Sequence, residues 1–178
     1  GVTGIKEGPS IVFDPESITY DELVGGDMPK THFTVTSVAG LQKIEMYLVS
    51  ESGQMQYGFP IEFDNAETEY VFDEQIMYME GDKGFKVKAT DVYGQVKIVT
   101  MTVNYLTPAP PTITLKEDTV FADKDETKAI TLRMESQRGI RNVKIYRIED
   151  SQEVLAATKD FADSPLSVTE SLDVLLTN

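Results

Sequence analysis

The sequence predicts an all-β chain of two tandem β-sandwiches, the second lacking its last two strands. One observation is a repeat, because GLQKIEMY at residues 40–47 returns as GIRNVKIY at residues 139–146, an offset of 99 (139 − 40). A repeat of this length is one small domain and is too long for a solenoid unit. The other observation is a succession of short alternating segments with turn residues about every 8–12 positions, which is typical of sandwiches.

In the first half, turn residues separate strands of modest length. Residues 10–13 follow Pro9 and predict an edge strand, which ends at residues 14–16 because proline supplies no hydrogen-bond donor to a sheet. Residues 91–94 predict a hairpin turn in which Gly94 takes a positive φ. Alternating or β-branched residues predict the other strands, about seven in all, at 33–37, 43–48, 55–61, 70–72, 85–90 and 96–105.

A proline-rich junction separates the two copies. Three prolines within residues 108–111 favour extended polyproline geometry, so this segment is expected to be a semi-rigid linker. It joins a first domain at residues 1–107, of which 1–8 are expected to be loose, to a second domain at 112–178. In the second domain, strands equivalent to those of the first are predicted at residues 112–115, 130–134, 143–145, 166–168 and 172–174.

The second copy is expected to be incomplete. An offset of 99 from Tyr105 places the end of a full copy at about residue 204 (105 + 99), whereas the sequence ends at Asn178. The segment without a counterpart is residues 85–105, the last hairpin of the first domain. Two explanations stay open: the chain is a fragment of a longer protein, or a strand of a neighbouring chain completes the second domain.

Two segments resemble bacterial immunoglobulin-like domains. FKVKATDVYGQ at residues 85–95 resembles the family's penultimate strand, apolar-x-apolar-x-Ala-x-Asp-x-x-Gly-Asn/Gln, and GIRNVKIY resembles its third strand. The resemblance implies tandem immunoglobulin-like sandwiches in an extracellular protein, as in surface lipoproteins of polysaccharide-utilisation systems and in adhesin stalks. It also implies that the full-length precursor is anchored at the outer membrane. It carries no site residues, since fold alone does not give function.

Composition excludes several kinds of partner and site. The net charge of −14, from 30 acidic and 16 basic residues, would repel the phosphates of nucleic acids and of anionic membranes. No apolar run approaches the roughly 20 residues of a membrane-spanning helix, so no direct membrane insertion is expected. The absence of cysteine excludes disulfides, thiolate metal sites and cysteine nucleophiles.

No catalytic residue, metal ligand or cofactor is predicted. His32, the single histidine, lies at the start of a predicted strand and belongs to no catalytic motif. Acidic residues gather in two loops, where calcium binding is the alternative to solvated side chains, but no Asp-x-Asp-x-Asp-Gly loop is present and Lys124 interrupts the second group. The two groups are Asp14, Glu16, Asp21, Glu22 and Asp27, and Glu117, Asp118, Asp123, Asp125 and Glu126.

Tyr57, Phe59 and Tyr93 are the candidate ligand-binding residues. Sugar rings stack on flat aromatic side chains, although tryptophan is absent. Tyr57 and Phe59 lie in the predicted strand 55–61, which Gly58 and Pro60 interrupt, and Tyr93 lies in the predicted hairpin turn. Residues 77–79, Met-Tyr-Met, are expected to fill the core. We therefore expect a non-enzymatic cell-surface module that spaces domains or mediates adhesion to another surface protein. A glycan-binding component of a bacterial polysaccharide-uptake system is the alternative, and an enzyme is the least favoured of the three.

Overall fold

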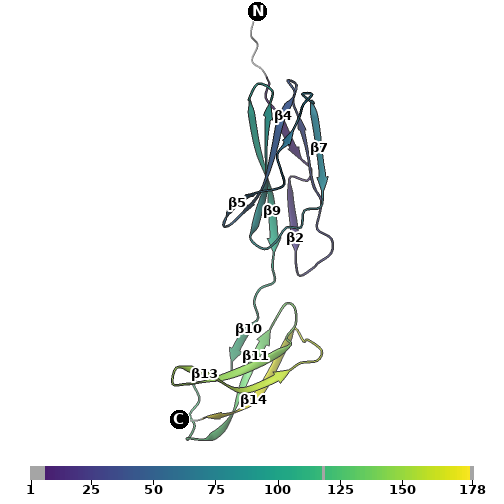
Figure 1. The fold of residues 1–178 in the computed structure, drawn as a ribbon. Coiled ribbons are helices and arrows are strands. Elements are labelled where there is room, and N and C mark those ends of the chain that lie inside the picture. The colour runs from purple at the N-terminus through teal and green to yellow at the C-terminus, as the bar shows by residue number, and fades with distance from the viewer. Residues whose placement is uncertain (1–6, 118, 177–178) are drawn as a thin grey trace, which may run out of the picture. The chain divides into compact units, whose positions relative to one another are not determined.

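The structure is a computed structural model that describes residues 7–117 and 119–176 (Figure 1). The chain divides into two compact units, Gly1–Thr107 (unit 1) and Pro108–Asn178 (unit 2). The described residues form only strands, turns and loops, so the predicted all-β class is confirmed. Nowhere in this part of the chain is there a helix long and apolar enough to cross a membrane. Asp118 and most of the predicted loose N-terminus lie outside the described residues.

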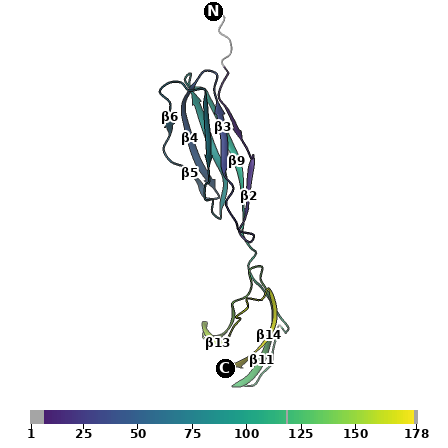
Figure 2. The ribbon, with the colours of Figure 1, turned by 90° about the vertical axis from the view of Figure 1, so that its right-hand side faces the viewer.

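Unit 1 is a sandwich of two sheets, as Figure 2 shows. The smaller sheet has the order β1-β3-β7, and the larger has the order β2-β9-β8-β4-β5, with the short strand β6 also paired to β4. All pairs are antiparallel except β2 with β9. The strands are β1 (Ser10–Phe13), β2 (Ser17–Asp21), β3 (Thr31–Thr36), β4 (Leu41–Ser50), β5 (Gly53–Gln56), β6 (Ile61–Glu62), β7 (Glu69–Glu74), β8 (Asp82–Asp91) and β9 (Val96–Leu106).

This distribution of strands is immunoglobulin-like, with β4, β8 and β9 adjacent in one sheet and β1, β3 and β7 in the other. The expectation of about seven strands was too low, because the described part of unit 1 has nine strands. Residues 17–21 form β2, which was not predicted, and the segment 55–61 is divided between β5 and β6. The break at residues 14–16 is as expected and contains a cis peptide bond before Pro15.

The core of unit 1 lies between the two sheets, where alternate residues of each strand point inward. Phe33 on β3 is fully buried, and its ring centroid lies 4.9 Å from that of Phe72 and 5.2 Å from that of Phe13. The ring centroid of Phe85, on β8 of the opposite sheet, lies 6.2 Å from that of Phe33. These four rings, contributed by both sheets, hold the layers together, since buried aromatic side chains remove the largest apolar areas from water.

Unit 2 also has two sheets. One has the order β10-β11-β14, and the other pairs β12 with β13, with a register shift between Ile145 and Tyr146. Figure 2 shows β11 and β14 as one curved layer. The described residues of unit 2 match β1-β3-β7 and β4-β5 of unit 1 but contain no counterpart of β8 and β9. The strands are β10 (Thr112–Leu115), β11 (Glu126–Glu135), β12 (Asn142–Glu149), β13 (Gln152–Asp160) and β14 (Ser167–Leu176).

The repeat seen in the sequence extends to backbone geometry. Gly40 and Gly139 stand at equivalent corners, with φ angles of 102° and 94°. Each lies against a non-glycine residue that also has a positive φ, Ala66 at 50° and Ser164 at 44°. A Cβ atom on either glycine would come closer to that neighbour's carbonyl oxygen than real Cβ atoms do. The two units therefore use glycine at the same corner for the same steric reason.

Candidate functional site

The structure places Tyr57 and Phe59 in the connection between β5 and β6, with different surroundings. The Tyr57 ring packs edge-on against Phe85, with centroids 5.5 Å apart, and its hydroxyl donates to Glu74 at 3.4 Å. Burial, followed by the negative charge of Glu74, raises the pKa of Tyr57 above its usual value. Phe59, in contrast, is 91% exposed. Only one of these two neighbouring rings is thus fully presented to a ligand.

Tyr93 lies in the turn between β8 and β9, and Asp91 organises this turn. The Asp91 carboxylate is fully buried and accepts hydrogen bonds from the backbone N–H of Tyr93 at 3.0 Å and of Gln95 at 2.8 Å. The Gln95 side chain also donates to it, at 2.7 Å, and Gly94 has the expected positive φ, 80°. The Asp-x-x-Gly-Gln pattern is therefore explained by turn geometry, which leaves the Tyr93 ring exposed.

The three predicted ligand-binding residues do not form one platform. The backbone N–H of Tyr57 bonds to the carbonyl of Met46, whereas that of Val92, next to Tyr93, bonds to the carbonyl of Gly40. Met46 and Gly40 are six residues apart along an extended strand, which corresponds to about 20 Å. Phe59 and Tyr93 thus belong to separate regions of the surface, and sugar binding at either one stays a prediction.

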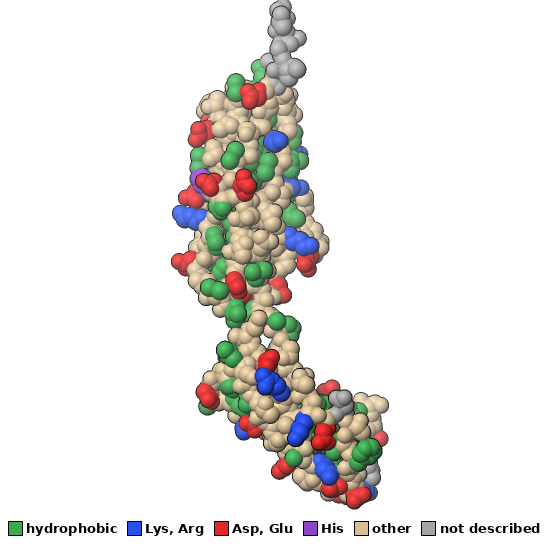
Figure 3. Space-filling view, turned by 180° about the vertical axis from the view of Figure 1, so that it is seen from behind, with side chains coloured by type: hydrophobic (Ala, Val, Ile, Leu, Met, Phe, Trp, Pro, Cys, Tyr) green, Lys and Arg blue, Asp and Glu red, His purple; other side chains and the backbone are tan. Residues whose placement is uncertain are grey.

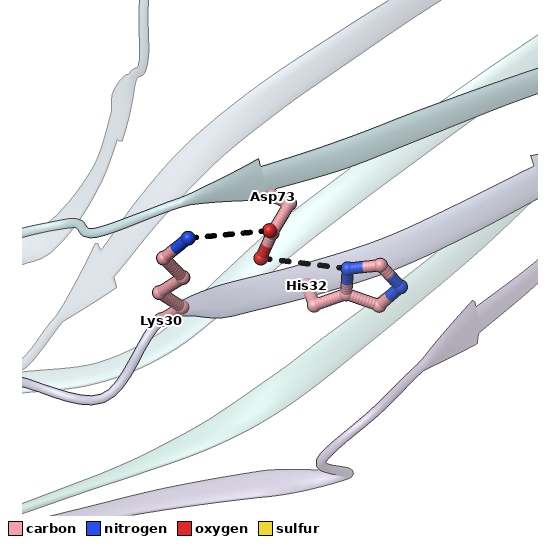
Figure 4. Close-up of polar contacts among 3 residues, drawn as sticks. All are labelled: Lys30, His32 and Asp73. Carbon is pink, nitrogen blue, oxygen red and sulfur yellow. Dashed lines mark hydrogen bonds and ion pairs between the residues drawn. The ribbon is translucent and has the colours of Figure 1, made fainter.

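His32 lies in a polar cluster on the outer face of the smaller sheet (Figure 4). Its Nδ1 atom is 3.5 Å from one carboxylate oxygen of Asp73, and the Nζ atom of Lys30 is 3.4 Å from the other. The register of β3 and β7 sets His32 directly opposite Asp73. All three side chains are at least one-third exposed, so the cluster is best explained as a surface ion pair, worth at most about 1 kcal/mol.

The expectation that residues 77–79 fill the core was wrong for both methionines. Tyr78 is buried, and its hydroxyl lies 2.6 Å from the Oγ1 atom of Thr31. Met77 and Met79 point to solvent and are 70% and 68% exposed. Burial alternates along the segment, and Ile76 and Tyr78 take the inward positions. Apolar character alone did not distinguish the inward from the outward positions.

The two outward methionines take part in an exposed apolar hollow that the sequence analysis missed. Met77, Met79, Met55 of β5 and Leu48 of β4 line this hollow, which has a volume of about 500 Å³. Met55 is itself 66% exposed. We call this site the methionine hollow. The run of four apolar residues, Ile76 to Met79, was the available signal, and the structure buries two of them and exposes the two methionines.

The pH dependence of stability is expected to report the burial of Tyr78. Burial is the main cause that raises the pKa of Tyr78 to about 12, and the hydrogen bond with Thr31 acts in the opposite direction. The folded state therefore favours the neutral phenol, and its contribution to stability is complete below pH 10 and is lost as the pH rises from 10 to 12. Urea unfolding at pH 9, 10 and 11, followed by circular dichroism, should show this loss.

Tyr78→Phe is the matched variant, because it removes the ionisable group and keeps the ring. Its stability should fall less steeply between pH 9 and 11 than that of the parent chain. A residual slope is expected from Tyr57 and Tyr70, whose pKa values are also raised by burial and by Glu74. Parallel curves for the parent and the Tyr78→Phe variant would contradict the assignment.

The acidic loops show no metal centre within the part of the chain that the structure describes, where no three histidine or carboxylate side chains come close enough to hold an ion. Glu126 illustrates how such acids are used. Its carboxylate accepts a hydrogen bond from the Asp123 backbone at 2.8 Å and contacts Lys128 at 3.2 Å. These partners, the backbone donor first, lower the pKa of Glu126. This carboxylate thus stabilises its own turn.

Calcium is accordingly expected to leave stability unchanged. Asp21 and Glu126 already accept hydrogen bonds from the backbone of their own turns, and a ligand raises stability only when the folded state binds it. The melting temperature measured in millimolar calcium should equal that measured with a chelator. A rise of several degrees with calcium would contradict this expectation and would support the calcium alternative for the acidic loops.

Comparisons with known proteins add a distant structural likeness. No family model and no curated protein matches the sequence. Among solved structures, the crystal structure of Dpr11 IG1 bound to DIP-gamma IG+IG2 is similar over 96% of this chain and 84% of that one, with 13% identical residues and a TM-score of 0.31. The immunoglobulin-like fold of this chain follows from its own strand order, described above.

Proposed function

We propose that this chain is a non-enzymatic cell-surface module that binds another protein through the methionine hollow. The observation that carries the proposal is the exposure of Met55, Met77 and Met79 around one hollow. A contiguous group of exposed apolar side chains is unfavourable in water and marks an interaction site when it occurs on a folded domain. Methionine suits such a site because its flexible, polarisable side chain adapts to the surface that it contacts.

The rim of the methionine hollow indicates the chemistry of the partner. Glu51, Glu80 and Asp82 surround the apolar centre, and the chain as a whole carries a net charge of −14. On the face shown in Figure 3, acidic and basic side chains are scattered. The charge expected of the partner is therefore inferred from the acidic rim of the hollow. An apolar centre within a polar rim is the usual anatomy of a protein interface. The expected partner inserts an apolar side chain flanked by lysine or arginine.

The cell-surface setting is proposed from the resemblance of residues 85–95 to bacterial immunoglobulin-like domains. In this setting the chain would be exported, and the full-length precursor would be anchored at the outer membrane. The module would then space or present binding surfaces outside the cell. Acidic, cysteine-free sandwiches suit this role because they stay soluble and need no disulfide to fold.

A peptide library displayed on phage provides the test. Selection against the chain should enrich peptides that combine one large apolar residue with lysine or arginine. Met77→Glu should abolish their binding, because it places a charge in the apolar centre. Val24→Glu is the matched control, since Val24 is at least as exposed as Met77 and does not line the hollow. Enriched peptides that bind the Met77→Glu variant as tightly as the parent chain would refute the proposal.

Glycan binding is the second candidate, and the exposure of Phe59 favours it. A ring that is 91% exposed next to Pro60 offers a flat apolar face of the kind on which sugars stack. A glycan array should then show hits that Phe59→Ala removes. Tyr93→Ala tests the other exposed ring in the same way. An array without hits, or hits that persist in both variants, would remove this candidate.

A further inference from the structure

The six methionines of unit 1 fall into two groups by exposure. Three are buried, with 5%, 5% and 1% of their surface exposed, and the other three are 66%, 70% and 68% exposed. The buried group is Met28, Met46 and Met101, and the exposed group is Met55, Met77 and Met79. All three exposed side chains line the methionine hollow, so the thioethers of unit 1 that water can reach are gathered at one place.

The backbone around Met77 and Met79 holds both side chains outside the core. Tyr78, between them, is buried, and its hydroxyl lies 2.6 Å from the Oγ1 atom of Thr31. The backbone N–H of Met79 donates to the Asp82 carboxylate at 2.7 Å, and the backbone N–H of Asp82 donates to the Met79 carbonyl at 3.0 Å. Drawing either methionine into the core would break these contacts, so both thioethers stay accessible.

The strands β4 and β5 supply the rest of the apolar lining. Met55 of β5 stands opposite Leu48 of β4 in the register of the two strands. Leu48 lines the hollow and also packs against the core of unit 1. The apolar lining of the hollow therefore consists of one leucine and three thioether side chains, and a change in the polarity of the thioethers alters most of it.

Peroxides oxidise accessible thioethers. A lone pair of the sulfur attacks one oxygen of hydrogen peroxide, and an S–O bond forms as the O–O bond breaks. The leaving hydroxide takes the proton of the transferred oxygen and becomes water, so the sulfur loses the two electrons that the peroxide gains. The product, methionine sulfoxide, is polar where the thioether was apolar. A buried thioether reacts only when the structure around it opens.

We propose that the methionine hollow is a site of methionine oxidation, and that sulfoxides at Met55, Met77 and Met79 weaken the binding of an apolar partner side chain there. The second part rests on the proposed function of the hollow. An apolar side chain placed against a sulfoxide removes water from a polar group and gives it no new hydrogen bond. Because the three sulfurs lie outside the core, the fold stays intact while the binding surface changes.

Peptide mapping by mass spectrometry tests the selectivity of oxidation. Residues 1–178 are treated with hydrogen peroxide, and the sulfoxide content of each methionine is followed with time. The three methionines of the hollow should react about as fast as free methionine in the same solution. The three buried methionines of unit 1 should react about tenfold more slowly or slower still, since they wait for local opening. Equal rates at all six would overturn the proposal.

The effect on binding is measured with methionine-free peptides selected on the reduced chain. Fluorescence anisotropy should show that oxidation of the chain weakens their binding about tenfold, because a polar group then lies within the apolar contact. The loss of affinity should follow the time course of sulfoxide formation in the hollow. The far-ultraviolet circular dichroism spectrum should not change. A loss of affinity that accompanies a changed spectrum would overturn the proposal, because unfolding would then explain it.

Two variants assign the effect to the hollow. The chain with Met55→Leu, Met77→Leu and Met79→Leu keeps an apolar lining and has no oxidisable sulfur there. Whatever its affinity for the peptides, peroxide should leave that affinity unchanged. Met101→Leu is the matched control, because it removes a buried sulfur, and peroxide should weaken its binding as in the parent chain. Equal weakening of the triple variant and the parent chain would overturn the proposal.

The outcomes separate this inference from the proposed function. Peptides that bind the reduced and the oxidised chain equally well would overturn the inference and leave the proposed function standing. Failure to select any peptide would refute the proposed function, and control of binding by oxidation would fall with it. The selectivity of oxidation is measured by peptide mapping in either case.

Discussion

Phe33→Ala is expected to lower the free energy of unfolding of unit 1 by about 3–5 kcal/mol, the usual range for a buried phenylalanine. Phe33 is fully buried, and its ring contacts rings from both sheets. Truncation leaves a cavity at the centre of the sandwich, and Phe72 and Phe85 lie in different sheets, so they cannot close it together without moving the layers. Most of the cost therefore comes from contacts that the neighbouring rings lose.

Urea unfolding followed by circular dichroism measures this loss. Val12→Ala is the matched control, because Val12 lies on the adjacent strand β1 but points to solvent. It should cost less than about 1 kcal/mol, the range of strand propensity alone. A loss below about 1.5 kcal/mol for Phe33→Ala would mean that the four rings do not form the centre of the core.

Gly40→Ala is expected to lower the free energy of unfolding of unit 1 by about 3 kcal/mol or more, through two effects that add. The φ angle of 102° is one that residues with a Cβ atom rarely adopt. The new Cβ would also lie 2.6 Å from the Cβ and the carbonyl oxygen of Ala66. The obstacle includes backbone, so the corner between β3 and β4 must move to admit the methyl group.

Gly81→Ala separates the two effects. Gly81 has a similar φ, 94°, but nothing lies within 4 Å of its ideal Cβ position. Its substitution should therefore cost only the conformational strain, about 1–2 kcal/mol. Gly139→Ala should reproduce the larger loss in unit 2, where the corner is repeated at Ser164. Equal losses for Gly40→Ala and Gly81→Ala would show that the close approach to Ala66 has no energetic weight.

The sequence predicted the parts of the fold in which one face of a strand is buried. Residues 33–37, 43–48 and 85–90 alternate clearly, and they form β3, β4 and β8, whose inward side chains make up the core. The strand β2 was missed although Ile18 and Tyr20 alternate with Ser17, Thr19 and Asp21, which was the available signal. The strand β13 gave a weaker signal, since none of its side chains is fully buried.

The candidate site was less predictable, because function depends on which side of the chain a residue faces. The sequence identifies Tyr57 as an aromatic residue of an interrupted strand, but only the structure shows its ring packed against Phe85. Met77 and Met79 were assigned to the core on apolar character, whereas in the structure both are exposed. The lack of counterparts of β8 and β9 among the described residues of unit 2, in contrast, was expected from the repeat.

The parallel pairing of β2 with β9 has a mechanical consequence. The two strands stand near opposite ends of unit 1 in the sequence and are matched from Ser17 with Thr102 to Asp21 with Leu106. Tension applied along the polypeptide draws parallel neighbours in opposite directions, so the bonds of this ladder are loaded in shear and must break together. Antiparallel neighbours pulled from one end separate one bond at a time. A tether built from such units would resist stretching first at the paired strands β2 and β9.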